Sequence, residues 1–156
     1  MTPIQIRPYD RADLNAIIEV FNDSVRHVAS RHYRPAQIDA WAPTAVNTAQ
    51  WSERLERKPT FIAEYGSQVA GFSDLEPTGH IDMLFVHSDY QGLGIARRFL
   101  NHILLKAREQ NISALTTHAS ITARPFFERS GFRVVQEQDV QLRGETFRNY
   151  RMERAI

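Results

Sequence analysis

The chain has 156 residues, a length that fits one domain with a substantial buried core. Its 19 Lys and Arg residues nearly balance its 18 Asp and Glu residues, so the net charge of +1 predicts binding neither to nucleic acid nor to a membrane surface. The chain has no cysteine, which excludes disulfides, thiolate metal sites and cysteine nucleophiles, and its histidines show no metal-binding spacing such as H-E-x-x-H.

The N-terminal sequence M-T-P-I-Q-I-R-P lacks the apolar core of a signal peptide. No run of about 18 apolar residues, the length that predicts a membrane-spanning helix, occurs in the chain. We therefore expect a soluble, cytoplasmic protein with no membrane partner, whose residues 1–156 form a single domain.

The first third of the chain predicts one strand followed by helices. Residues 4–7 alternate as in a short strand, and Asp10 is placed to cap a helix that continues to about residue 30 with apolar residues at helical spacing. A second helical piece follows Pro35, inside a segment rich in proline and aromatic residues at 32–44 that predicts a broken helix or an ordered loop. Residues 50–57 predict another helix.

The middle of the chain predicts strands and then a long helix. Residues 60–65 and 68–75 read as a hairpin with its turn at Gly66-Ser67. Residues 80–86 alternate, and side chains in a strand point to opposite faces in turn. The alternation predicts one face made of Ile81, Met83 and Phe85 and a second face made of His80, Asp82, Leu84 and Val86. Residues from about 92 to 108 then repeat every three or four positions and predict a helix packed on a sheet.

The last third predicts a strand at 113–118, a short helix within 121–132 that ends at Gly131, and two closing strands at 132–142 and 146–153 around Gly144. Strands before, between and after the helices predict a mixed α/β sheet of about six to seven strands flanked by helices. The long middle helix would cross over between parallel strands.

The stretch Q-G-L-G-I-A, residues 91–96, lies between the alternating strand and the long helix. The first N–H groups of a helix are unpaired and carry partial positive charge, so a helix N-terminus suits a phosphate. Glycines at 92 and 94 would let the chain curl and point successive amides at such a ligand. A simple turn before the helix explains the two glycines equally well. The dinucleotide-binding fingerprint fits poorly, because Arg97 occupies the third glycine position and residues 111–118 contain no acidic residue.

Two segments resemble a known family. The sequence MLFVHSDYQGLGIARRFL, residues 83–100, resembles the strand and the Q/R-x-x-G-x-G/A acetyl-CoA loop of the GCN5-related N-acetyltransferases (GNAT). The sequence ARPFFERSGF, residues 123–132, is similar to the later A-x-x-F-Y-E-x-x-G-F segment of that family. The segments follow the family order and separation, and the pattern of strands and helices extends the likeness over nearly the whole chain. The resemblance implies a bacterial stand-alone GNAT enzyme that transfers an acetyl group from acetyl-CoA, its co-substrate, to a primary amine by direct attack.

The resemblance also implies which residues hold the co-substrate. In the family, the loop amides bind the pyrophosphate, the preceding strand hydrogen-bonds the pantetheine arm, and the N–H that corresponds to Leu84 meets the thioester carbonyl. A fixed N–H at that place would stabilise the oxyanion as the amine attacks. The implied residues are Leu84, Phe85, Val86, Gln91, Gly92, Leu93, Gly94, Ile95, Ala96, Arg97, Ser120 and Phe127.

A protonated amine must lose a proton before it can attack, so a base or a water chain is needed near the thioester carbon. On the predicted face of Leu84, Asp82 lies about 6.6 Å along the strand and His80 about 13 Å, and the family places its base at positions matching these two. The usual pKa of about 6.5 favours histidine, whereas the distance favours Asp82. We expect the pair to act together, with His80 acting through water. The alternatives are a surface histidine and a carboxylate that pairs with an arginine, and we interpret His87 and His118 as structural.

The acceptor amine is less defined by the sequence. The first helix and residues 32–41 would form its wall, with Asn22, His27, Tyr33 and Trp41 as candidate contacts, although packing explains Trp41 as well. The partner is a small-molecule or peptide amine, no metal is expected, and the protein would be a monomer or a homodimer. A non-catalytic acetyl-CoA or CoA-binding sensor or regulatory module is the alternative function.

The chain departs from the family pattern at one position of the second segment. Many relatives have a tyrosine there that is proposed to protonate the leaving thiolate, and this chain has Phe127. Because a thiol pKa of about 8.5 makes the thiolate a tolerable leaving group, we expect turnover without that tyrosine, with water, Ser120 or Tyr150 supplying the proton.

Overall fold

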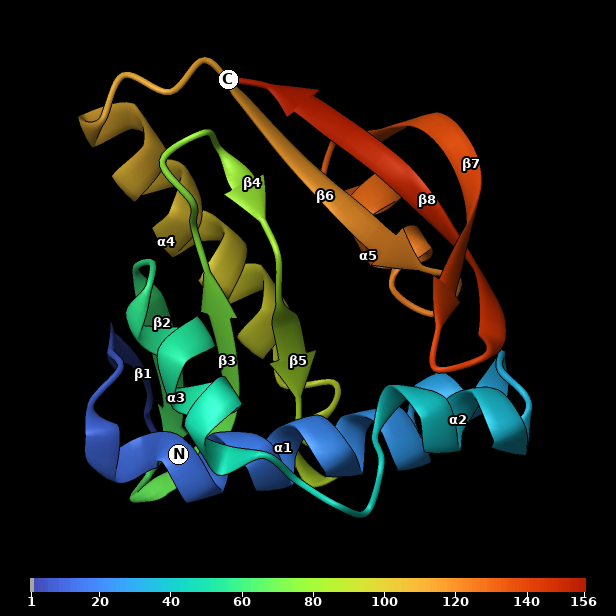
Figure 1. Cartoon of the computed structure of the whole chain (residues 1–156). Helices are drawn as coiled ribbons and strands as arrows, with labels where there is room; N and C mark the ends of the chain where they lie inside the picture. The colour runs from blue at the N-terminus through green and yellow to red at the C-terminus, as the bar shows by residue number, and fades with distance from the viewer. Residues whose placement is uncertain (1) are drawn as a thin grey trace.

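The computed structural model describes residues 2–156. Within this range eight strands form two four-stranded sheets, flanked by five α-helices and three short 3₁₀ helices (Figure 1). The strands are β1 (Ile4–Pro8), β2 (Thr60–Tyr65), β3 (Gln68–Asp74), β4 (His80–Ile81), β5 (Leu84–Val86), β6 (Ala114–Ser120), β7 (Arg133–Leu142) and β8 (Glu145–Ala155). The α-helices are α1 (Leu14–His27), α2 (Pro35–Trp41), α3 (Thr48–Glu56), α4 (Ile95–Glu109) and α5 (Arg124–Arg129), and the 3₁₀ helices are η1 (Arg11–Asp13), η2 (Ala29–Arg31) and η3 (Ser88–Tyr90).

The first sheet has the strand order β1-β2-β3-β5, and all its neighbours are antiparallel. The second sheet has the order β4-β6-β8-β7, in which β4 and β6 run parallel. Because α4 lies between β5 and β6 in the chain, it is the connection that brings β6 beside β4. This arrangement confirms the predicted mixed α/β fold with a crossover helix between parallel strands. The strands number eight because residues 80–86 form two short strands where one was expected.

The two sheets are joined through that divided strand. β4 pairs with β6 in the second sheet, whereas β5, two residues later, pairs with β3 in the first. Beyond β4 the two sheets therefore separate, and Figure 1 shows β5 and β6 diverging, with α1 and α2 crossing one end of the opening.

Side chains at the end of β3 hold the break between β4 and β5. The Asp74 carboxylate accepts hydrogen bonds from the backbone N–H groups of Asp82 (2.8 Å) and Met83 (3.1 Å), and the Ser73 hydroxyl donates to the Met83 carbonyl (2.7 Å). Asp74 and Ser73 are both fully buried. Buried backbone N–H and C=O groups need hydrogen-bond partners. At this break the partners are side chains of β3 instead of the backbone of a neighbouring strand.

The break changes which side chains share a face, and the predicted alternation is wrong at this point. Ile81 and Leu84 pack into the core cluster beneath α4, whereas Met83 and Phe85 pack into the cluster beneath α1. The alternation expected Ile81, Met83 and Phe85 on one face. Since Ile81 is the neighbour of His80, His80 lies on the face of Met83 and Phe85, opposite to the side chain of Leu84.

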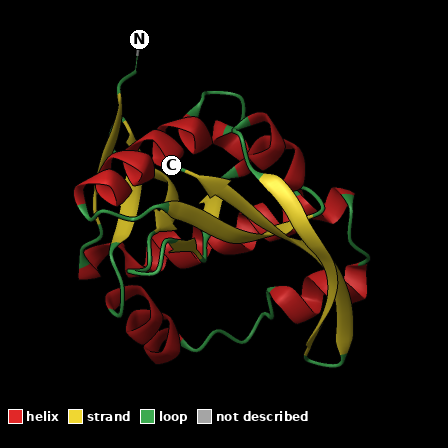
Figure 2. Ribbon diagram, turned by 90° about the horizontal axis from the view of Figure 1, so that it is seen from above, coloured by secondary structure: helices red, strands yellow, loops and turns green. Residues whose placement is uncertain are grey.

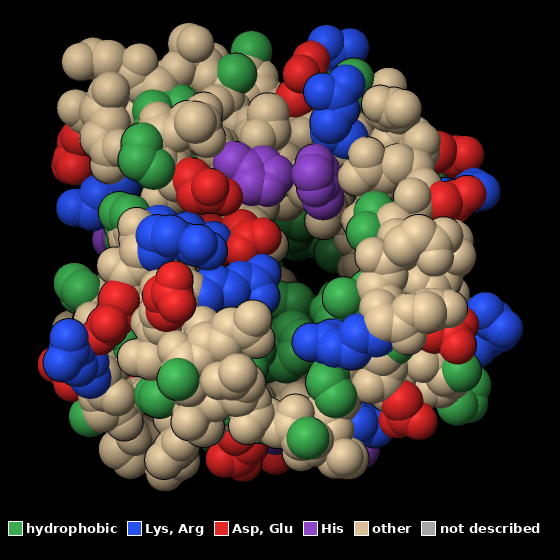
Figure 3. All heavy atoms as spheres, viewed as in Figure 1, with side chains coloured by type: hydrophobic (Ala, Val, Ile, Leu, Met, Phe, Trp, Pro, Cys, Tyr) green, Lys and Arg blue, Asp and Glu red, His purple; other side chains and the backbone are tan. Residues whose placement is uncertain are grey.

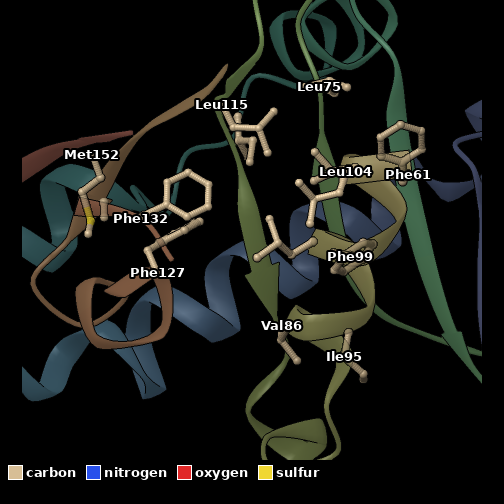
Figure 4. Close-up of a cluster of buried hydrophobic side chains, with 14 of the residues drawn as sticks. Phe61, Leu75, Val86, Ile95, Phe99, Leu104, Leu115, Phe127, Phe132 and Met152 are labelled. Carbon is tan, nitrogen blue, oxygen red and sulfur yellow. The ribbon is translucent and has the colours of Figure 1, made fainter. Parts of the chain in front are cut away.

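Two apolar layers cover the strands, and Figure 2 shows helices on both sides of them. The layer under α4 continues into the second sheet, where Phe127 and Phe132 pack with Met152 (Figure 4). The other layer joins α1, α2 and α3 to the opposite face, with Phe72 at its centre. Apolar residues at helical spacing give each helix one apolar face, and burial of that face holds the helix against a sheet.

Several boundaries differ from the sequence expectation by a few residues. α1 ends at His27, with a 3₁₀ turn after it, and α4 begins at Ile95 rather than near Gly92. Asp10 caps as predicted, although the turn it caps is 3₁₀ before α1 begins. In the part of the chain that the structure describes, no helix is long and apolar enough to cross a membrane.

Candidate active site

A cleft with a volume of about 720 Å³ lies where the two sheets separate. Residues of α1, α2, α3, β5, β6, α5 and the β7–β8 hairpin line it. Figure 3 shows the hollow in this face of the molecule, with apolar side chains on its floor, histidines on one border and basic side chains on two opposite sides.

One wall of the cleft is the edge of β5. The N–H of His87 donates to the Ala70 carbonyl (2.9 Å), and the register pairs Phe72 with Phe85 and Ser73 with Leu84. Hydrogen-bonded and non-hydrogen-bonded pairs alternate in an antiparallel ladder, so the backbone groups of His87 and Phe85 point toward β3. Those of Leu84 and Val86 consequently point away from β3, toward β6.

The opposite wall is the edge of β6. The N–H of Thr116 donates to the Gly79 carbonyl (3.0 Å), which shows that the backbone groups of Thr116 point toward β4. Residues two apart along a strand point their backbone groups the same way, so those of His118 and Ser120 face the cleft. Two strand edges with outward-pointing N–H and C=O groups thus face one another across the gap, an arrangement that suits an extended molecule with amide groups of its own.

The glycine loop follows β5. Gly92 and Gly94 have φ values of 76° and 81°, which L-residues with a side chain rarely adopt. A Cβ at either position would meet nothing within 4 Å, so the conformation and not crowding requires glycine there. Gln91 ties the loop to the strand by donating from Nε2 to the Val86 carbonyl (3.0 Å). Gly94 is the N-cap of α4 and gives it no side-chain cap, so no cap side chain satisfies the first amides of the helix.

Asp82 lies on the cleft in a cluster of charges. Its carboxylate accepts hydrogen bonds from Lys58 (2.6 Å) and Arg54 (2.8 Å), and the Lys58 side chain is only 7% exposed. Burial alone would raise the pKa of Asp82, but the hydrogen bonds and charges of Lys58 and Arg54 outweigh it and hold the pKa below its usual value. A carboxylate held in this way is a weak proton acceptor at neutral pH.

His80, at the start of β4, does not line the cleft itself, and its Nδ1 is 2.9 Å from the Thr116 hydroxyl. The ring of His118 packs edge-on to the ring of His80 with centroids 5.0 Å apart, and His118 lines the cleft itself. Desolvation, together with the charges of His80 and Arg151, lowers the pKa of His118. His118 is therefore neutral at pH 7 and able to accept a proton. The sequence interpretation gave His118 no part in the site.

The four candidate acceptor contacts divide into two groups. Asn22, Tyr33 and Trp41 line the cleft. Tyr33 is buried, and its hydroxyl already donates to the Arg148 carbonyl (2.7 Å) and accepts from the N–H of Ile121 (3.0 Å). His27 lies elsewhere, in a shallow depression beside α1 that it shares with Asp23 and His87.

Ser120 and Phe127, expected beside the arm of the co-substrate, both line the cleft. The Ser120 hydroxyl accepts a hydrogen bond from the N–H of Ala123 (3.0 Å) at the start of α5. Phe127 is 3% exposed and packs edge-on against Phe126 and Phe132. The side chain of Phe127 thus serves as an apolar wall.

Comparison with known proteins identifies the family. The family model described as an acetyltransferase (GNAT) domain matches residues 29–154. YafP, an uncharacterized N-acetyltransferase of Escherichia coli K12, is 41% identical over 153 residues, which are 97% of this chain and 96% of YafP.

Solved structures agree with this family. The crystal structure of a GCN5-related N-acetyltransferase from Rhodopseudomonas palustris superposes with a TM-score of 0.95 at 31% identity, covering 100% of this chain and 97% of the other. PaiA N-acetyltransferase of Thermoplasma acidophilum, solved in complex with coenzyme A, shares the fold with a TM-score of 0.81 at 18% identity, over 99% of each chain. The chain belongs to the GNAT family and is an N-acetyltransferase that takes its acetyl group from acetyl-CoA.

Proposed function

We propose that the protein acetylates a small-molecule or peptide amine by direct attack on acetyl-CoA held between β5 and β6. The observation that carries the proposal is the pair of strand edges that face the gap, with both backbone groups of Leu84 and the N–H of Val86 on one side and the backbone groups of His118 and Ser120 on the other. The amides of a pantetheine arm would complete these edges as an added strand does. PaiA, which shares the fold, was solved in complex with coenzyme A, and this supports coenzyme A as the kind of molecule that the fold can bind.

The loop at residues 91–97 would hold the pyrophosphate. Its glycines adopt left-handed backbone conformations in open space, and the uncapped first turn of α4 carries partial positive charge. Gln91 ties the loop to the end of β5 by its hydrogen bond to the Val86 carbonyl. These residues therefore fit an anionic group at the end of an amide-containing arm.

Acetyl-CoA supplies an acetyl thioester, whose carbonyl carbon accepts the electron pair of the amine. The Leu84 N–H points into the cleft, where it would donate to the oxygen that becomes negative during attack. The carbon–sulfur bond then breaks, its electron pair leaves on the thiolate, and the proton lost by the nitrogen goes to a base. Phe127 has no proton to give, so water or a neighbouring hydroxyl protonates the thiolate.

We assign the base to the histidine pair and place His118 nearest to the amine. Its lowered pKa keeps the ring neutral and it lines the cleft, whereas His80 is not among the lining residues and is hydrogen-bonded to Thr116. The sequence expectation combined His80 with Asp82. The hydrogen bonds of Asp82 to Lys58 and Arg54 favour a different task for that carboxylate, namely fixing the basic side chains beside β5.

The experiment is a pH profile of thiol release from acetyl-CoA with a panel of amines. The wild-type kcat/KM should rise with pH through a value below about 6.5, the usual histidine pKa, because the base must be neutral. His118→Asn should lower kcat/KM at pH 7 by about 10²- to 10⁴-fold, flatten that limb and leave acetyl-CoA affinity intact. The matched control is His102→Asn on α4, since burial also lowers the pKa of His102 but it lies outside the cleft. If the low-pH limb of the profile were unchanged in His118→Asn, the base assignment would be wrong. If none of the amines in the panel gave any thiol release, the CoA-binding module would be favoured instead.

A further inference from the structure

The part of the cleft in front of β5 is a chamber with aromatic walls. Its rings come from five different elements and touch edge-on in a chain, with centroids 4.9 to 6.2 Å apart. They belong to Trp51, Phe21, Phe85, Trp41 and Phe147, all of which line the cleft. Such a surface favours an apolar or aromatic body on the molecule that enters, because its burial removes apolar area from water.

The charges around this chamber are predominantly positive. Arg54, Arg57 and Arg143 line it, against the carboxylates of Glu53 and Asp82. The Asp82 carboxylate pairs with Arg54 and Lys58, and Lys58 also pairs with Asp74, so this cluster adds little charge of either sign and leaves Arg57 and Arg143 against Glu53. An ammonium group alone would be repelled here, and an amine that brings its own negative charge would be attracted.

Arg143 has an unusual backbone. With φ of 47° it occupies the first position of the two-residue turn between β7 and β8, followed by Gly144 with φ of 82°. Turns of this type favour Asn, Asp or Gly at that position, because a left-handed conformation strains other residues by roughly 1–2 kcal/mol. A strained residue on a site points to a function that its side chain performs.

The side chain of Arg143 reaches from the hairpin to α2. Its Nη1 donates to the Ala40 carbonyl (2.6 Å), which holds the guanidinium over the chamber. A guanidinium has five N–H donors, so this single bond leaves donors in a planar array that matches a carboxylate. The hairpin tip thus presents a tethered carboxylate-binding group opposite the wall formed by α3.

We propose that the acceptor is a free amino acid with an apolar or aromatic side chain, whose carboxylate binds Arg143 and whose side chain occupies the aromatic chamber. This inference rests on the proposed function and specifies its substrate class. The carboxylate neutralises the chamber's positive charge, and the α-amine is left to face β5 and His118.

The test compares phenylalanine, leucine and methionine with their amides and with phenethylamine, by thiol release from acetyl-CoA. The free acids should have kcat/KM values about 10- to 100-fold above those of the amides, the usual effect of one charge-assisted hydrogen bond. Arg143→Asn should abolish that preference by raising the KM of the acids, and should leave the amides and acetyl-CoA unaffected. Asn tolerates the left-handed turn, and relief of about 1–2 kcal/mol of strain offsets the lost hydrogen bond to the Ala40 carbonyl, worth about 0.5–1.5 kcal/mol, so this variant should fold about as stably as the wild type.

Two control variants sharpen the result. Arg143→Lys keeps the charge and should retain part of the preference, and Arg129→Gln, an exposed arginine of α5 outside the cleft, should retain all of it. Acetylation of amines such as phenethylamine without any preference for the free acids would overturn the inference and leave the proposed function standing. A preference for dipeptides over amino acids would also overturn it. If none of the amines gave thiol release, both this inference and the proposed function would be overturned.

Discussion

Gly71→Ala tests how closely β3 and β5 approach beneath the cleft. Among the glycines, all of which the structure describes, Gly71 is the one without a positive φ, so its conformation suits alanine. Glycine is needed at this position because there is no room for a Cβ atom. A Cβ would lie 2.8 Å from the Phe85 carbonyl oxygen and 3.2 Å from the ring of Phe99, and the first of these contacts is with backbone that has no rotamer to change.

We expect Gly71→Ala to destabilise the protein, although Gly→Ala substitutions at a permitted backbone conformation usually stabilise. Gly→Ala at a permitted conformation commonly stabilises a protein by about 0.4–1 kcal/mol, because it restricts the unfolded chain. Overpacking of a buried site typically destabilises by about 1–3 kcal/mol. The shortest contact is with the β5 backbone, so we expect the destabilisation by overpacking to exceed the stabilisation from restricting the unfolded chain. The net loss should be about 1–2 kcal/mol, or a Tm lowered by roughly 2–8 °C for a chain of this size.

The variant should also lose acetyl-CoA affinity, because relief of the clash moves the strand that carries Leu84 and Val86. Thermal unfolding and calorimetric titration measure the two effects. Gly144→Ala is the matched control, since its Cβ meets nothing within 4 Å and its positive φ strains only the hairpin tip. That control should lose stability by roughly 1–2 kcal/mol and keep its acetyl-CoA affinity. A Gly71→Ala protein as stable as the wild type would show that β3 and β5 do not approach as closely as the structure describes.

Two further variants address the co-substrate site. Gly94→Glu should weaken acetyl-CoA binding severely in a calorimetric titration, because it adds negative charge where an anion would bind, whereas Gly94→Ala should weaken it less, since it adds only backbone strain; equal affinity of Gly94→Glu and wild type would contradict the loop assignment. Phe127→Tyr should change kcat by less than about tenfold, which is under about 1.4 kcal/mol of barrier, because the thiolate can leave without an acid. An inactive wild type beside an active Phe127→Tyr variant would show that the missing hydroxyl is decisive.

Local patterns in the sequence predicted most of the fold. The apolar spacing of α4, the Gly66 hairpin and the closing strands around Gly144 depend on residues close together in the chain, and the structure shows each of them. The break after β4 could not be predicted in this way. The alternation of residues 80–86 continues through it without a signal, and the side chains that hold it, Ser73 and Asp74, come from another strand.

The candidate site shows the same limit. Asn22 lines both the cleft and the depression beside α1, whereas His27, five positions later and about 140° further round the helix, lines only the depression. His118 was given no role, although its alternation with Ser120 placed both residues on one face of β6. The pairing of His80 with Thr116 across parallel strands was needed to bring His118 beside His80. Tertiary pairing decides which of several histidines can meet.

The break between β4 and β5 also explains how two substrates can reach one place. Backbone N–H groups lie in the plane of a sheet, whereas side chains stand perpendicular to it. The Leu84 N–H therefore points along the sheet into the gap beside β6, where the thioester would lie. The face switch meanwhile turns Met83 and Phe85 toward the aromatic chamber and Leu84 toward α4. An amine entering through the chamber approaches the face of the sheet, at about a right angle to the N–H that would hold the carbonyl oxygen. Direct attack requires access from outside the plane of the carbonyl group, and a regular strand at 80–86, paired with β6 along its whole length, would have closed the gap.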